Sequence, residues 1–233
     1  MSDPRRALVI SAHPDDIEFG AAGTIAAWVE EGWDVRYVIV TSGQKGTQDT
    51  TMTAEDFGRI RETESVEAAR AVGVTDVTFL RWMDSEVVYG PELQRALSRE
   101  FRRHRPHRLM AMKPDILPTD FFVNHPDHRA VGTATLDITV TGGTTAAIFP
   151  ELLDEGLEPW QGLEETWLMG PGGGPRVVDV THTFERKMQA LEAHVSQVGD
   201  WDVRAFLGPR LAEVGKSHGY PYAESFRVIS RLR

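Results

Sequence analysis

The sequence contains no cysteine, and this absence removes several kinds of chemistry together. Without thiols the protein has no disulfide, no thiolate zinc site and no cysteine nucleophile. Any transition metal must therefore be held by histidine and carboxylate side chains. The chain has eight histidines and 35 acidic residues, so such a site is feasible.

Basic residues are also scarce, since 25 Lys and Arg face 35 Asp and Glu and leave a formal charge of -10. Binding of nucleic acid or of an anionic membrane depends on a surplus of Lys and Arg, so we expect neither partner. No uncharged apolar run approaches the roughly 20 residues of a membrane span. The apolar stretch 7–10 is too short for a signal peptide, which predicts a cytoplasmic protein.

Short β-prone runs alternate with helical periodicity, and the 233 residues suit one α/β domain over 1–233. We predict strands over 7–10, 35–40, 77–80, 108–112, 166–169 and 176–180, and helices over 20–31, 54–71, 91–104 and 184–195. This alternation predicts a Rossmann-like parallel sheet sandwiched by helices.

The segment 142–174 is rich in Gly, Pro and acidic residues and has little periodicity. We expect an irregular excursion that passes over the site or reaches a neighbouring subunit. Its aromatic residues Phe149, Trp160 and Trp167 suit two roles. They are either interface anchors of a homo-oligomer or parts of the core.

The first predicted strand is followed by His13, Pro14, Asp15 and Asp16 instead of a glycine-spaced phosphate loop, so we do not expect NAD binding. This loop falls at the carboxyl ends of the strands, where open α/β sheets bind their ligands. Imidazole and carboxylate suit Zn²⁺ or Fe²⁺, and a second, free carboxylate can take a proton from water that the metal activates. The simpler alternative is that an aspartate caps the next helix.

A second cluster, His125 to His128, follows the strand over 108–112 and should reach the same crevice. His128 can complete a His, His and carboxylate set with His13 and Asp16, with open positions for water and substrate. His125 is then free to act on the substrate, and Asp127 can fix a histidine tautomer. The alternative is a surface turn with two solvated histidines.

Together these motifs resemble the PIG-L/LmbE-like deacetylases, metal-dependent enzymes that remove acetyl groups from N-acetylglucosaminyl compounds. The resemblance rests on 12–16, 23–25, 41–43 and 125–128, and it extends to Arg61, Glu64, 68–69 and Gly73. It implies a metal-dependent deacetylase site and covers roughly the first 135 residues well. It departs from many members at Ile17 and Glu18, where they carry Glu directly after the paired aspartates, and the C-terminal third matches only loosely.

The resemblance also implies roles for the two motifs. His13, Asp16 and His128 would hold one divalent metal, Zn²⁺ in the first place with Fe²⁺ as the alternative. Asp15 would be the general base. His125, in its protonated form, would support the oxyanion or protonate the leaving amine. Asp127, counted with the catalytic residues on the reasoning from its own motif, would fix a histidine tautomer and raise its basicity.

Two further residues are candidates for substrate binding. The resemblance suggests Arg61 as a substrate contact, and the alternative is a solvated helix charge paired with Glu62 or Glu64. His194 belongs to a C-terminal motif of some members, which would bring it to the pocket, whereas the alternative is a histidine on a helix surface. The excursion and the C-terminal third are expected to choose the substrate.

The predicted function is that of a metal-dependent N-deacetylase acting on an N-acetylated sugar or glycoconjugate. Three alternatives stay open. An amidase on a thiol conjugate or another amide would use the same site, and a non-catalytic relative would bind a ligand only. A phosphoesterase is disfavoured, because no second metal cluster is evident and the net charge opposes anionic substrates.

Overall fold

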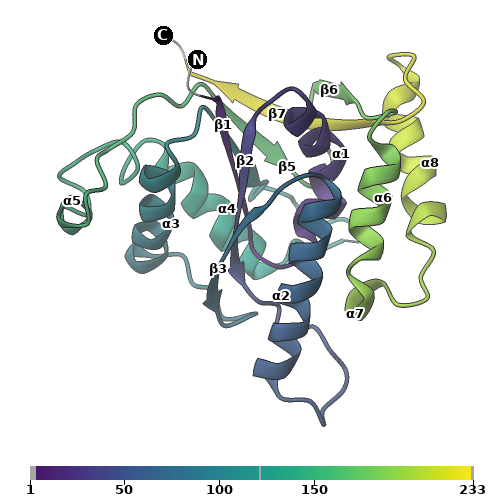
Figure 1. Ribbon diagram of the computed structural model, residues 1–233, viewed down its shortest axis with the longest axis horizontal. Helices are drawn as coiled ribbons and strands as arrows, with labels where there is room; N and C mark the ends of the chain where they lie inside the picture. The colour runs from purple at the N-terminus through teal and green to yellow at the C-terminus, as the bar shows by residue number, and fades with distance from the viewer. Residues whose placement is uncertain (1–3, 121, 232–233) are drawn as a thin grey trace.

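The computed structural model describes residues 4–120 and 122–231. Its centre is a sheet of seven strands in the order β3-β2-β1-β4-β5-β7-β6 (Figure 1). The strands are β1 (Arg6–Ser11), β2 (Asp34–Thr41), β3 (Asp76–Trp82), β4 (Arg108–Met112), β5 (Glu165–Met169), β6 (Arg176–Asp179) and β7 (Ala223–Ser230). The first five run parallel, whereas β7 is antiparallel to both of its neighbours.

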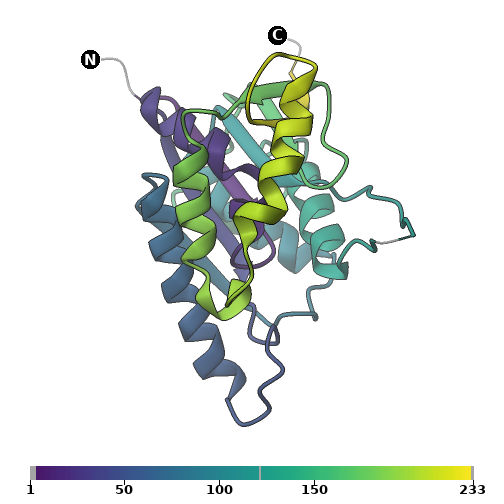
Figure 2. The same cartoon turned by 90° about the vertical axis from the view of Figure 1, so that its right-hand side faces the viewer.

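Helices cover both faces of this sheet. They are α1 (Asp16–Glu30), α2 (Ala54–Ala71), α3 (Pro91–His104), α4 (Pro126–Ile138), α5 (Glu151–Asp154), α6 (Phe184–Glu192), α7 (Val195–Val198) and α8 (Val203–Lys216). The pair α3 and α4 lies on one face, and α1, α2 and α6 pack together on the other, with α8 against α6 and β7 (Figures 1 and 2). None of the helices in the described residues has the length and apolar character to cross a membrane.

The core sits around β1, where Leu8, Val9 and Ile10 are fully buried. A strand covered on both faces reads as a continuous apolar run, which explains why this stretch lacks alternation. Trp167 on β5 is also buried, and its ring lies edge-on to Trp28 at 5.1 Å. Of the two predicted roles, Trp167 therefore has that of a core residue. Phe149 and Trp160 are half-buried.

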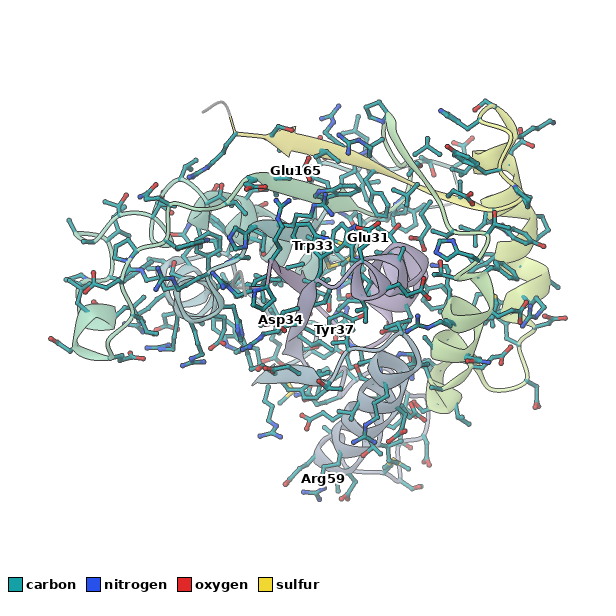
Figure 3. All side chains as sticks on the ribbon, turned by 45° about the horizontal axis from the view of Figure 1, so that its top comes forward. Glu31, Trp33, Asp34, Tyr37, Arg59 and Glu165 are labelled. Atoms are coloured by element: carbon teal, nitrogen blue, oxygen red, sulfur yellow. The ribbon has the colours of Figure 1, made fainter. Side chains whose placement is uncertain are left out.

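The amino ends of the strands are closed by an aromatic and ionic cluster. The Arg108 guanidinium lies 4.1 Å from the Trp33 ring centroid, and its Nε donates to Glu165 Oε2 at 2.9 Å. Trp33 precedes β2 and Glu165 begins β5 (Figure 3). This edge of the sheet is packed by its own side chains. The loops that carry the two motifs follow the ends of β1 and β4, and they therefore lie at the other, carboxyl edge.

The predicted α/β fold is confirmed, and three elements, 54–71, 91–104 and 108–112, have the predicted bounds. The excursion expected over 142–174 contains the short α5 and also the whole of β5. The helix predicted over 184–195 ends at Glu192. Neither α8 nor β7 was predicted. Within α8, Pro209 is a residue that normally interrupts a helix.

Candidate active site

The turn between β1 and α1 has a strained backbone that aims its polar side chains. The main-chain N–H of His13 donates to Asp16 Oδ2 at 2.8 Å. Asp15 occupies the N-cap position of α1, but its side chain makes no capping hydrogen bond. Its φ of 89° lies in the left-handed region that residues with a Cβ seldom adopt. Strain of this kind costs on the order of 1–3 kcal/mol and tends to occur at functional sites. The alternative in which Asp15 serves only as a helix cap is therefore not supported, and both carboxylates belong to this one strained turn.

His128 lies in the first turn of α4 and faces the β1–α1 turn. Its Nε2 is 3.2 Å from His13 Nδ1 and 3.0 Å from Asp16 Oδ1. His13 Nδ1 is 3.5 Å from Asp16 Oδ2. Tetrahedral zinc with bonds of about 2.0–2.1 Å requires ligand atoms roughly 3.3 Å apart, so these three side chains fit one such ion. His125 also has a ring nitrogen within 4.8 Å of the other two imidazoles.

The second nitrogen of His13 is held by carboxylates. Its Nε2 lies 3.1 Å from Asp127 Oδ2 and 3.4 Å from Asp84 Oδ1. Asp127 is fully buried and also accepts from the main-chain N–H of Ser85 at 2.7 Å and of Val87 at 3.3 Å. A carboxylate that accepts from Nε2–H leaves the Nδ1 lone pair directed at the candidate metal position.

Asp84 was not among the predicted site residues. It is 5% exposed and stands two residues after the end of β3, at the same edge of the sheet as the two motifs. A single aspartate after a strand carries no motif. The only signal in the sequence was its position at a strand end.

The electrostatics of this group favour a cation. Burial by itself lowers the pKa of His13, but three facing carboxylates together raise it to about 12. They belong to Asp127, Asp16 and Asp84. Burial raises the pKa of Asp16, yet the hydrogen bonds and charges of His128 and His13 hold it well below its usual range. A proton or a divalent metal ion satisfies this cluster of negative charge.

Arg61 binds the turn that carries Asp15. The side chain is buried, and its Nη2 donates to Asp15 Oδ2 at 3.0 Å and to the Pro14 carbonyl at 2.7 Å. Its Nη1 donates to the Gly43 carbonyl at 3.0 Å. Burial and the charge of Asp16 raise the pKa of Asp15 to about 7, while Arg61 lowers it. Arg61 is therefore no solvated helix charge, and substrate contact by this residue stays a prediction.

His125 is the N-cap of α4, and its Nδ1 accepts from the main-chain N–H of Asp127 at 3.3 Å. Burial lowers the pKa of His125, and the positive charge of His13 lowers it further. This lowered pKa favours the neutral ring, and because Nδ1 accepts a hydrogen bond, the proton of the neutral ring lies on Nε2. We expected a protonated His125, but a neutral Nε2–H can also donate a hydrogen bond to an oxyanion.

His194 is fully buried, with its Nε2 3.2 Å from Glu18 Oε2. The alternative of a histidine on a helix surface is therefore wrong. The residue lies behind the turn of Asp15, whose pKa it lowers by its charge. Complete burial opposes direct contact with a substrate, and the predicted binding role stays a prediction.

The fold and this geometry define a class of protein. It is an α/β protein with a cluster of His and carboxylate side chains, and a half-buried spare carboxylate, at the carboxyl edge of its sheet. The chain belongs to the PIG-L family, whose model, described as GlcNAc-PI de-N-acetylase, matches residues 8–139. The resemblance seen in the sequence motifs is confirmed.

Individual relatives extend this similarity over nearly the whole chain. The diacetylchitobiose deacetylase of Thermococcus kodakarensis is 28% identical over 98% of this chain and 84% of its own length. A 1D-myo-inositol 2-acetamido-2-deoxy-alpha-D-glucopyranoside deacetylase of Mycobacteroides abscessus is 29% identical over 83% of this chain and 82% of its own. The solved N,N'-diacetylchitobiose deacetylase of Pyrococcus horikoshii superposes with a TM-score of 0.90 at 31% identity, over 98% of this chain and 85% of that one. These relatives are named as deacetylases, so the predicted enzyme class is confirmed.

Proposed function

We propose that this protein is a metal-dependent hydrolase that removes an acetyl group from the amide nitrogen of an N-acetylglucosaminyl-type or related N-acetylated small molecule. The observation that carries the proposal is the close approach of two imidazoles and one carboxylate, with the free carboxylate of Asp15 beside them. His13 Nδ1 and His128 Nε2 lie 3.2 Å apart, with Asp16 within 3.5 Å of both. Similarity to deacetylases supports the substrate class.

The metal would be held by His13, Asp16 and His128. We propose Zn²⁺, with Fe²⁺ as the alternative, because nitrogen and carboxylate oxygen suit both ions. When bound, such an ion acts as a Lewis acid and lowers the pKa of water toward neutrality. Asp127 keeps the His13 ring oriented through Nε2.

The other side chains manage protons and charge at the acetamide. Asp15 takes the proton from the attacking water, and the Arg61 hydrogen bond holds the Asp15 carboxylate in place. The Nε2–H of His125 donates to the oxyanion that develops on the acetyl carbonyl. The leaving nitrogen needs a proton. Asp15 can return the proton that it took from water, whereas His125 can give one only from its protonated form, and the products are acetate and a free amine.

The test is acetate release together with metal content in one purified sample. N-acetylglucosamine, N,N'-diacetylchitobiose and an N-acetylated thiol conjugate form the panel of substrates. We expect acetate from an amino sugar, loss of activity on chelation and recovery with Zn²⁺ or Fe²⁺. His128→Ala should lose both metal and activity.

Other outcomes would replace the proposal. Release from the thiol conjugate alone would make the protein an amidase of that class. A sample that holds no metal and takes up none on addition would favour a non-catalytic binding protein. Full activity after exhaustive chelation would remove the metal from the mechanism.

A further inference from the structure

Trp201 differs from the other tryptophans of the chain. All six lie in the described residues, and five are buried or half-buried, whereas Trp201 is 45% exposed. It stands in the short link between α7 and α8, where its main-chain N–H donates to the Val198 carbonyl at 2.8 Å. Its ring stacks on Phe19 with centroids 6.0 Å apart and lies 4.7 Å from Phe206. The exposed ring is thus supported by two other aromatic side chains.

This support ties the ring to the helix whose N-terminal end carries Asp15 and Asp16. Phe19 belongs to the first turn of α1, and its main-chain N–H donates to the Asp15 carbonyl at 3.0 Å. Residues three and four apart share one face of a helix, so Phe19 lies on the face that begins with Asp15 and Asp16. The four-residue step from Asp15 to Phe19 advances only about 6 Å along the helix axis.

The α7 segment also touches the other wall of the site. Gln197 Nε2 donates to the Gly46 carbonyl at 3.3 Å. Ser196 donates to Glu64 of α2 through its main-chain N–H at 2.8 Å and through its hydroxyl at 2.6 Å. The same β2–α2 loop provides the Gly43 carbonyl that Arg61 binds. The α7 segment that leads into the Trp201 link is therefore bonded to the α2 side of the site, while the Trp201 ring itself contacts Phe19 of α1.

The chemistry of the ring and its neighbours suits a sugar. A pyranose presents C–H groups on one face, and the electron-rich face of an indole attracts them. Its hydroxyl groups point sideways and seek acceptors. Trp201 is flanked by Asp200 and Asp202, both exposed. Asp202 uses Oδ1 to cap α8 by accepting from the Ala205 N–H at 2.8 Å.

We propose that Trp201 is the stacking platform for a second sugar ring, the one joined to the N-acetylglucosaminyl unit whose acetamide reaches the metal. This rests on the proposed function, because the acetamide fixes where the first ring lies. The platform would receive the second ring. It gives the enzyme a preference for disaccharides or glycoconjugates over N-acetylglucosamine itself.

Kinetics of two substrates test the platform in the full chain. For Trp201→Ala we expect KM for N,N'-diacetylchitobiose to rise about 3- to 10-fold with little change in kcat, the range expected for one aromatic contact. KM for N-acetylglucosamine should change less than twofold. Trp201→Tyr should keep most of the preference. The matched control is Tyr220→Ala, which removes another exposed aromatic residue, 37% exposed and outside the site.

If Trp201→Ala changed KM equally for both sugars, or for neither, the proposed platform would be overturned. A shift in oligomeric state on size exclusion for Trp201→Ala would overturn it too, since the ring would then be an interface between copies.

A binding experiment separates the platform from the proposed activity. Tryptophan emission is recorded for Asp15→Asn, with and without Trp201→Phe, during titration with N,N'-diacetylchitobiose. We expect a saturable change that disappears with Trp201→Phe. Absence of that difference overturns the platform even if the enzyme deacetylates sugars. Its presence without acetate release from the wild-type protein overturns the proposed function and leaves sugar binding at Trp201 in place.

Discussion

At the scale of single residues, the central feature is Asp15, a carboxylate that is not one of the proposed metal ligands. Asp15 sits between Asp16, which raises its pKa by charge, and Arg61, which lowers it. An aspartate with a pKa near neutrality is suited to take and return a proton at that pH. The left-handed backbone at Asp15 fixes the direction of this side chain.

Asp15→Asn tests the proposed base. The amide keeps the size of the side chain and an oxygen for Arg61, but it cannot accept a proton from water. We expect deacetylation to fall by a factor on the order of 10² to 10⁴, the usual contribution of a positioned base, with metal content unchanged. Acetate release and metal analysis of the same preparation measure both quantities. Full turnover by the variant would show that Asp15 is not the base.

Arg61→Met tests how the pKa of Asp15 is set. Arg61 lowers this pKa, so its removal should raise it. Only ionised Asp15 acts as a base, and activity therefore increases as pH rises through its pKa. The acidic limb of kcat/KM against pH should move to higher pH in the variant.

The control for this experiment is Arg59→Met on the same helix, because Arg59 is exposed and pairs only with Glu55 and Asp56 in the described structure. Its pH profile should match that of the wild-type protein. An unshifted limb in Arg61→Met, with measurable activity, would contradict the assignment.

At the scale of elements, α1 is held by side chains from the C-terminal third. Lys187 of α6 donates through Nζ to the carbonyls of Glu18 at 2.7 Å and Phe19 at 2.9 Å, and it pairs with Glu224 Oε1 at 2.8 Å. Glu224 of β7 accepts from the main-chain N–H groups of Gly23 at 3.1 Å and Thr24 at 2.8 Å. A buried ion pair thus bonds main-chain groups inside the helix whose first turn carries the site.

This pair makes a prediction about stability. Lys187→Met should destabilise the protein by about 3–5 kcal/mol, because Glu224 is left buried without its partner charge. Lys187→Met combined with Glu224→Gln should recover part of that loss, since the amide oxygen still accepts a hydrogen bond. Urea unfolding of the two single variants and the double variant measures the coupling. Strictly additive effects would mean that the pair does not act as a unit.

At the scale of the whole molecule, the site joins the β1–α1 turn to the β4–α4 turn. Two segments 115 residues apart meet with His13 and His128 3.2 Å from each other. A ligand that binds only the folded chain stabilises it. The proposed metal should therefore stabilise the fold by linking the β1–α1 turn to the β4–α4 turn. The predicted cytoplasmic location and self-association concern the same scale and stay predictions.

Chelation should therefore lower the melting temperature. Free Zn²⁺ at 100 times its Kd adds about 2.7 kcal/mol, which for a chain of this size is a rise of roughly 5–10 °C. Differential scanning calorimetry with and without chelator measures the shift. His128→Ala serves as the control, and its melting temperature should change neither with added Zn²⁺ nor with chelator. An equal response of the variant would place the stabilising metal elsewhere.

The sequence by itself determined the local parts of this protein. The motifs at 13–16 and 125–128, the apolar run of β1 and the periodicity of α2 and α3 depend on neighbours along the chain, so pattern and residue type were enough. Only the tertiary structure decided that β7 runs antiparallel between β5 and β6. Only it placed Asp84 on His13, Arg61 on Asp15 and His194 in the interior. Strand order and burial depend on contacts between residues far apart in sequence, and no local pattern records them.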